Sequence, residues 1–182
     1  MLCAALLRKT AWICFRLFSF LTPSSCNNDT AVKGDGMMTK RIPYDQIAPD
    51  GLHIMMNMEA YTKTSGINRT TRELMKIRAS QLNGCAYCIN IHTKDARKMG
   101  ETEQRIYGLN AWEECSFYTP EEKAALLLTE HVTFISNKRM PDDVYQEVRK
   151  FYNEKEYVDL ILIINQINSW NRIAISMGNI AE

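Results

Sequence analysis

Apolar residues recur at helical spacing along most of this 182-residue chain, and that pattern constrains the fold more than any other feature. The segment 154–177 carries Val158, Leu160, Ile161, Ile163, Ile164 and Ile167. It is apolar on most sides, as expected for a helix at the centre of a fold. No window shows the sustained alternation of apolar and polar residues that a half-buried strand needs. The sequence therefore predicts an all-α domain.

Local start and stop signals divide the chain into helices. Thr119 is a candidate N-cap, with Pro120 at the first helical position and an acid at the third. Thr70 is another candidate N-cap, and Glu73 follows it at the spacing of a capping box. Glycines then predict helix ends, and a bend is expected near Gly108. These signals predict a bundle of about six to seven helices over residues 48–64, 70–83, 85–99, 102–114, 119–136, 141–152 and 154–177.

The first 37 residues differ from the rest. Residues 1–28 contain no acid, and their apolar run is interrupted by Arg16, so it is too short and too charged for a membrane span. Residues 1–37 are therefore predicted to be a leader, read as a mis-assigned start before Met37 or Met38, a targeting signal, or a disordered or membrane-associated tail. Residues 38–182 are predicted to form one domain. We expect a cytoplasmic protein, with export or organelle targeting left open by the leader.

The chemistry of the chain is concentrated in one motif, Cys85-Ala86-Tyr87-Cys88, with His92 four residues later. On a helix the two cysteines and His92 share one face, and Cys88 and His92 form an i, i+4 pair. Glu73, on a neighbouring element, can orient His92. Free backbone N–H groups at the helix start would favour a thiolate at Cys85. A CxxC pair at this place can form a disulfide with little backbone movement.

The same residues allow other interpretations. Cys85, Cys88 and His92 supply three zinc ligands, and a fourth could come from Glu73, His53 or His131. No second CxxC or histidine pair is visible, so neither a metal nor a cofactor is expected. His92 alone would suit a core histidine, and Glu73 alone a capping acid. A net charge of +1 gives no indication of a nucleic-acid partner.

The motif and its flanks resemble the carboxymuconolactone decarboxylase family, and within it the alkylhydroperoxidase D (AhpD)-like core domain. The resemblance covers about residues 42–178 and rests on Glu73, the segment 80–88, the segment 92–100 and the later Ile167-Asn168-Ser169-Trp170-Asn171-Arg172. It implies an AhpD-like helical bundle and a homo-oligomer, a trimer or hexamer. The sequence departs from the best-studied AhpD type at Tyr87, where that type has a histidine.

The resemblance implies a thiol-dependent hydroperoxide reductase, a peroxidase of the peroxiredoxin type. Carried over by position, Cys88 would attack the peroxide, Cys85 would resolve it, and His92 and Glu73 would relay protons. The implied partners are a hydroperoxide and an external dithiol reductant, thioredoxin-like or lipoyl-type. One alternative is a redox-responsive sensor or binding protein of the same fold with little turnover. Another is a decarboxylase of the type that names the family, although that enzyme lacks the CxxC pair.

Overall fold

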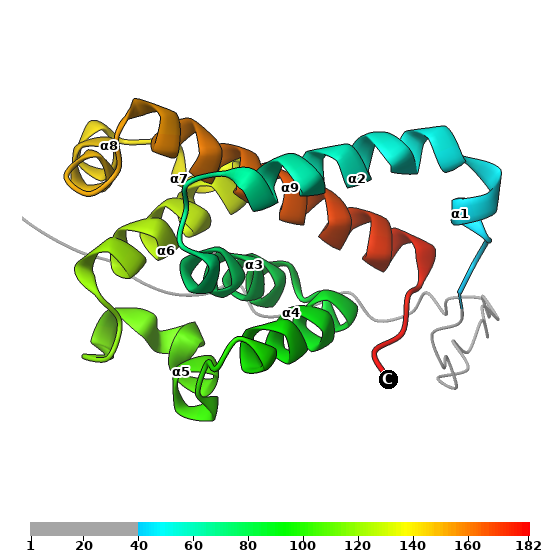
Figure 1. Ribbon diagram of the computed structural model, residues 1–182, viewed down its shortest axis with the longest axis horizontal. Coiled ribbons are helices and arrows are strands. Elements are labelled where there is room, and N and C mark those ends of the chain that lie inside the picture. Colours follow the sequence, from blue (N-terminus) through cyan, green and yellow to red (C-terminus); the bar gives the residue numbers. More distant parts are fainter. Residues whose placement is uncertain (1–39) are drawn as a thin grey trace, which may run out of the picture. The chain divides into compact units, whose positions relative to one another are not determined.

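The computed structural model describes residues 40–182, which form a bundle of helices (Figure 1). Within this range there are nine α-helices, one 3-10 helix and no strand, so the predicted all-α fold is confirmed. The elements are α1 Tyr44–Ile47, α2 Pro49–Thr64, α3 Arg69–Asn83, α4 Ala86–Lys98, α5 Glu103–Gly108, η1 Leu109–Glu114, α6 Pro120–Thr133, α7 Ile135–Lys138, α8 Asp142–Arg149 and α9 Glu154–Met177. The predicted leader, residues 1–37, lies outside the described residues. No helix of the described part is long and apolar enough to cross a membrane.

Helix α9 lies centrally in the bundle, as its apolar sequence predicts. It packs against α2, α3, α4, α6 and α8. Leu160, Ile163, Ile164 and Ile167 on this helix are completely buried. Helix α3 is the second central element, since it contacts α4, α6 and α9. In Figure 1, α2 crosses over one side of the bundle while α4 lies on the other side of α3.

The helix count of six to seven was too low, because two predicted helices are broken and one short turn was missed. The predicted helix 102–114 divides at Gly108 into α5 and η1, where Ala111 leaves the helical region. The predicted helix 119–136 breaks at Phe134, which has φ −104° and ψ 38°. The short helix α1 precedes Pro49, the first residue of α2.

The predicted caps were partly right. Thr119 and Glu122 form a capping box, with each side chain bonded to the other residue's backbone N–H. The predicted cap at Thr70 was wrong, because the Asn68 side chain accepts from the N–H groups of Thr70 and Thr71. Asx side chains are among the strongest N-caps. Glu73 is therefore not needed for capping and is available for another contact.

Candidate dithiol site

A tight turn brings the cysteine motif to the start of α4. Helix α3 ends at Gly84, whose φ of +67° lies in the left-handed region that favours glycine. The next residue, Cys85, donates its backbone N–H to the Ser80 carbonyl at 2.9 Å and is the N-cap of α4. Cys88 follows in the first turn of that helix. The motif is thus held between two helices rather than on a mobile loop.

The two thiols are free and adjacent. The Sγ atoms of Cys85 and Cys88 lie 2.8 Å apart, and the residues are 1% and 4% exposed. They pack with Ala79, Ile167 and Ala174. A disulfide bond is about 2.05 Å long, so closing one needs a movement of less than an ångström. The two thiols lie side by side, although Cys85 is the extended N-cap residue that precedes α4 and only Cys88 lies within the helix.

Burial raises the pKa of the Cys88 thiol to about 12, and the neighbouring Cys85 contributes to the rise. The side-chain amide of Asn171 acts in the opposite direction and lowers it. Asn171 is completely buried and is fixed by hydrogen bonds with Ser80 at 3.0 Å and Asn83 at 2.9 Å. The Asn171 side-chain amide, on α9, is thus held beside the Cys88 sulfur.

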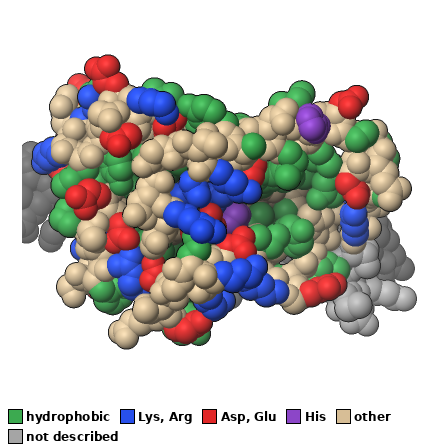
Figure 2. All heavy atoms as spheres, viewed as in Figure 1, with side chains coloured by type: hydrophobic (Ala, Val, Ile, Leu, Met, Phe, Trp, Pro, Cys, Tyr) green, Lys and Arg blue, Asp and Glu red, His purple; other side chains and the backbone are tan. Residues whose placement is uncertain are grey.

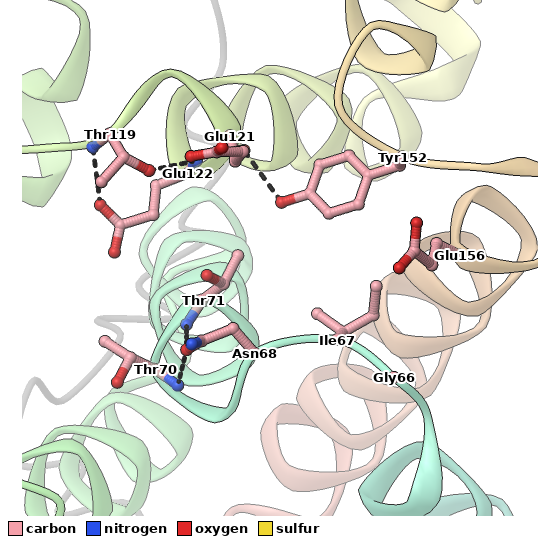
Figure 3. Close-up of a pocket in the computed structure, with 10 residues that line it drawn as sticks. All are labelled: Gly66, Ile67, Asn68, Thr70, Thr71, Thr119, Glu121, Glu122, Tyr152 and Glu156. Atoms are coloured by element: carbon pink, nitrogen blue, oxygen red, sulfur yellow. Dashed lines mark hydrogen bonds between the residues drawn. The ribbon is translucent and has the colours of Figure 1, made fainter.

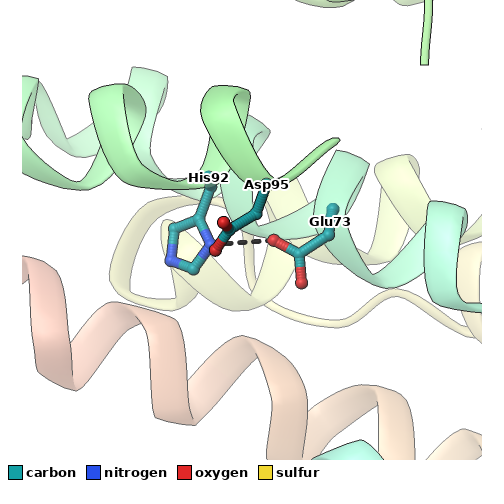
Figure 4. Close-up of side chains that lie close together, drawn as sticks. All are labelled: Glu73, His92 and Asp95. Carbon is teal, nitrogen blue, oxygen red and sulfur yellow. Dashed lines mark hydrogen bonds and ion pairs between the residues drawn. The ribbon is translucent and has the colours of Figure 1, made fainter. Parts of the chain in front are cut away.

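His92 and Glu73 meet as the sequence predicts. Figure 4 shows His92 and Asp95 on α4 directed toward Glu73 on α3. The distance from His92 Nδ1 to Glu73 Oε2 is 2.8 Å. With a proton on Nδ1 donated to the carboxylate, Nε2 is left as an acceptor. Although burial alone would raise it, the pKa of Glu73 is lowered by the His92 hydrogen bond and by the positive charge of Lys76.

A buried lysine extends this pair into a chain of charges. Lys76 is 1% exposed, and its Nζ lies 3.5 Å from Glu73 and 3.0 Å from Glu59 on α2. Glu59 also accepts a hydrogen bond from Gln166 on α9. Glu59 therefore joins α2 to both α3 and α9, and Lys76 holds in place the Glu73 carboxylate that is bonded to His92.

Cys88 and His92 border one apolar pocket of about 350 Å³. Its other walls include Met56, Tyr87, Ile91, Trp170 and Ala174. In the described residues Cys88 has its sulfur partner in Cys85, and no hydrogen bond joins it to His92. Cys85 is not among the residues that line the pocket. A small molecule entering it would therefore reach Cys88 first.

A second cavity of about 500 Å³, the charged cleft, lies on the other side of His92. Besides His92, Glu73 and Asp95, its lining residues include Glu59, Lys63, Arg69, Arg72, Lys76 and Lys98. Figure 2 shows Lys and Arg side chains gathered around a hollow on this face, between the positions of α2 and α4. Glu59, His92 and Asp95 line both cavities, so the charged cleft and the apolar pocket adjoin.

The predicted zinc alternative is not supported by the arrangement of the described residues. The group whose ligand atoms lie within 4.8 Å of one another is Glu73, His92 and Asp95, and neither cysteine belongs to it. His131 is bonded to the Arg139 carbonyl on another part of the bundle. Lys76 lies beside Glu73, and Lys98 lies 3.0 Å from Asp95. Lysines thus already balance the carboxylates that a cation would need.

A third cavity, of about 440 Å³, has no thiol or histidine (Figure 3). It lies where α3 and α6 begin, beside Tyr152 and Glu156. Its polar groups are engaged locally, since Asn68 caps α3, Thr119 caps α6, and the Tyr152 hydroxyl donates to the Glu121 carbonyl. We assign these residues to helix capping.

The residues singled out from sequence thus come together, but several neighbours were missed. Asn171, Asp95, Arg72 and Lys76 all border the site. Asp95 had a usable signal, because it lies three residues after His92 on the same helix. Tyr87 lines the apolar pocket and also packs against the buried cluster that contains both cysteines.

Known proteins share this sequence and arrangement. Residues 49–131 match the model of the carboxymuconolactone decarboxylase family. The uncharacterized protein YdfG of Bacillus subtilis is 69% identical over 142 residues, which are 78% of this chain and 97% of that protein. A protein of unknown function from Agrobacterium tumefaciens, named as a candidate antioxidant defence protein AhpD, is 35% identical with a TM-score of 0.77. The match covers 79% of this chain and 99% of that one.

The chain belongs to the carboxymuconolactone decarboxylase family. Its fold is that of the AhpD-like members. A peroxidase-related protein with an AhpD core from Ralstonia eutropha has a TM-score of 0.67, with 76% of this chain and 74% of that one covered. At 18% identity that likeness concerns the fold alone. The predicted family and core domain are confirmed.

Proposed function

We propose that this carboxymuconolactone decarboxylase family member reduces organic hydroperoxides through a Cys85–Cys88 dithiol cycle. The observation that carries the proposal is the pair of free thiols 2.8 Å apart, one of which, Cys88, borders a pocket that is also lined by His92, the histidine bonded to Glu73. The name of the Agrobacterium tumefaciens neighbour, a candidate antioxidant defence protein AhpD, supports the same interpretation.

The reaction has three balanced steps. His92, oriented by Glu73, takes the Cys88 proton through Nε2, and the sulfur attacks the distal peroxide oxygen. The O–O bond breaks, the leaving alkoxide takes a proton to become an alcohol, and Cys88 becomes a sulfenic acid. The Cys85 thiol then displaces the hydroxyl group of that acid as water and forms the disulfide. An external dithiol restores both thiols by exchange and is itself oxidised to a disulfide.

The raised pKa of Cys88 bears on the first step. At pH 7 a thiol whose pKa is raised this far is almost entirely protonated. Free thiolate would therefore be scarce, so proton transfer to His92 has to accompany the attack on the peroxide. The same observation favours the second candidate function, a redox-responsive sensor or binding protein that forms its disulfide with little turnover.

The proposal includes partners. The reductant is an external dithiol, thioredoxin-like or lipoyl-type, because the oxidised site needs two electrons from outside. We also propose a homo-oligomer, a trimer or hexamer. Helix α2 supports this, since Ile54 and Tyr61, seven residues apart on one face of the helix, expose 69% and 45% of their surface. Exposed large apolar side chains that share a face are typical of contact surfaces.

The test is peroxide consumption by the purified chain with tert-butyl hydroperoxide and dihydrolipoamide or dithiothreitol. Cys88→Ser is expected to abolish consumption, and Cys85→Ser to reduce it to a slow reaction that accumulates the sulfenic acid. Cys115→Ser is the matched control, because Cys115 lies after η1 and its sulfur contacts the carbonyls of Gly108 and Ala111. Full activity in Cys88→Ser would refute the mechanism. Rapid oxidation of wild type without turnover would favour the sensor.

A further inference from the structure

The charged cleft holds two arginines that no carboxylate of the described chain neutralises. Its three carboxylates are each paired with a lysine: Glu59 and Glu73 with Lys76, and Asp95 with Lys98. Arg69 and Arg72 have no ion-pair partner within 4.0 Å among residues 40–182. The cleft therefore carries an excess of positive charge beside the thiol pocket.

Arg72 is the more deeply buried of the two arginines. It is 7% exposed, and its Nη1 donates to the backbone carbonyls of Thr62 at 3.1 Å and Lys63 at 3.5 Å. Its Nε is buried without a hydrogen-bond partner. Burying a charged guanidinium without an opposite charge is unfavourable, and unpartnered buried donors are uncommon. An anion brought by a ligand would compensate this charge.

The position of the arginines relative to Cys88 indicates what kind of ligand fits. The charged cleft and the apolar pocket share Glu59, His92 and Asp95 as lining residues. The two cavities therefore adjoin, and a ligand that spans both would meet each kind of wall. Its apolar body would lie among Met56, Tyr87 and Trp170, and its anionic end would face the arginines. Guanidinium groups bind carboxylates through paired N–H donors.

We propose that the substrate is an organic hydroperoxide that carries a carboxylate, with the carboxylate bound by Arg72 and Arg69 and the peroxide presented to Cys88. This inference rests on the proposed function and adds the substrate class.

Binding of an analogue that cannot oxidise the thiols tests the proposal. Isothermal titration of wild type with ω-hydroxyoctanoate, its methyl ester and inorganic phosphate should show binding of the acid, at least tenfold weaker binding of the ester, and weak binding of phosphate. Arg72→Gln is expected to weaken the acid at least tenfold and Arg69→Gln several-fold. Lys94→Gln is the matched control, because Lys94 is exposed on α4 and bonds the Glu182 carbonyl.

Circular dichroism checks that Arg72→Gln is folded, and the exposed Arg69→Gln decides the question if it is not. Equal affinity for acid and ester, tighter binding of phosphate than of the acid, or unchanged binding by Arg69→Gln would overturn the proposal. With ω-hydroperoxyoctanoate as substrate, Arg69→Gln should raise KM, whereas the control Lys94→Gln should leave KM unchanged. If the acid binds but no peroxide is reduced, the carboxylate site stands and the peroxidase function fails.

Discussion

Replacing Glu73 by glutamine changes one charge beside His92 and little else. The amide is similar in size to the carboxylate, so packing between α3 and α4 is retained. Lys76 loses the partner at 3.5 Å but keeps Glu59 at 3.0 Å. What disappears is the charge-assisted hydrogen bond from His92 Nδ1, which measures 2.8 Å in the wild type.

The expected effect follows from burial and charge. The side chains of Glu73 and His92 are 9% and 15% exposed, so solvent screens their interaction only weakly. Hydrogen bonds to charged groups contribute about 1.5–3 kcal/mol. If the transition state carries the Cys88 proton on His92, losing that bond should slow peroxide reduction roughly 10- to 150-fold. The effect should be on kcat/KM, because the imidazolium is stabilised only as the proton arrives.

The assay compares kcat/KM for tert-butyl hydroperoxide in wild type, Glu73→Gln and Glu130→Gln. Glu130 is the matched control, since it is also a buried, ion-paired carboxylate but it binds Arg78 and Lys138 away from the thiols. Nitrogen NMR of His92 gives a second readout, because the Nδ1–H tautomer should lose its preference only in Glu73→Gln. A rate within twofold of wild type for Glu73→Gln would refute the relay.

Three further predictions concern the stability of the fold and the pKa of Cys88. Burial alone would raise the pKa of Glu130 above its ordinary 4.5. Hydrogen bonds from Lys138, Trp112 and Arg78 nevertheless lower that pKa to about 2. The resulting stability is complete above pH 4.5 and is lost as the pH falls toward 2, so Glu130→Gln should cost about 3 kcal/mol at pH 7 in urea unfolding, with the difference shrinking in acid. Gly84→Ala should cost about 1–2 kcal/mol through its φ of +67° alone, because nothing lies within 4 Å of the added Cβ, and thermal unfolding should show it as a lower Tm. Asn171→Ala should raise the pKa of Cys88 further, seen as slower alkylation of Cys88 at fixed pH, whereas Asn90→Ala should leave that rate unchanged.

The fold was largely predictable because its signals are local. Residues 154–177 read as one central helix, and the observed α9 has the same bounds. Breaks inside helices were not predictable in the same way. Phe134 ends α6 through its backbone angles, and no glycine or proline marks that position in the sequence. A helix count that relies on glycine and proline to mark helix ends is therefore too low.

The grouping of Cys85, Cys88, His92 and Glu73 was predictable, because the first three lie at the start of one helix or within it and Glu73 lies on the helix before it. The surroundings of this group depend on contacts between distant segments. Asn171 reaches Cys88 from α9, and Arg72 is buried under carbonyls at the end of α2. The sequence around Asn171 or Arg72 does not indicate which residue either side chain will contact. An arginine on an isolated helix, for example, is expected to be solvated. Tertiary packing alone creates the charged cleft.

We propose that Cys85 and Cys88 form one redox unit. Intact mass spectrometry after graded additions of tert-butyl hydroperoxide, with alkylation of the remaining thiols, tests it most directly. We predict the loss of two hydrogen atoms per chain, with Cys85 and Cys88 losing alkylation together and Cys115 still alkylated. Oxidation that joins either cysteine to Cys115, or alkylation of both Cys85 and Cys88 after peroxide has been consumed, would contradict the account.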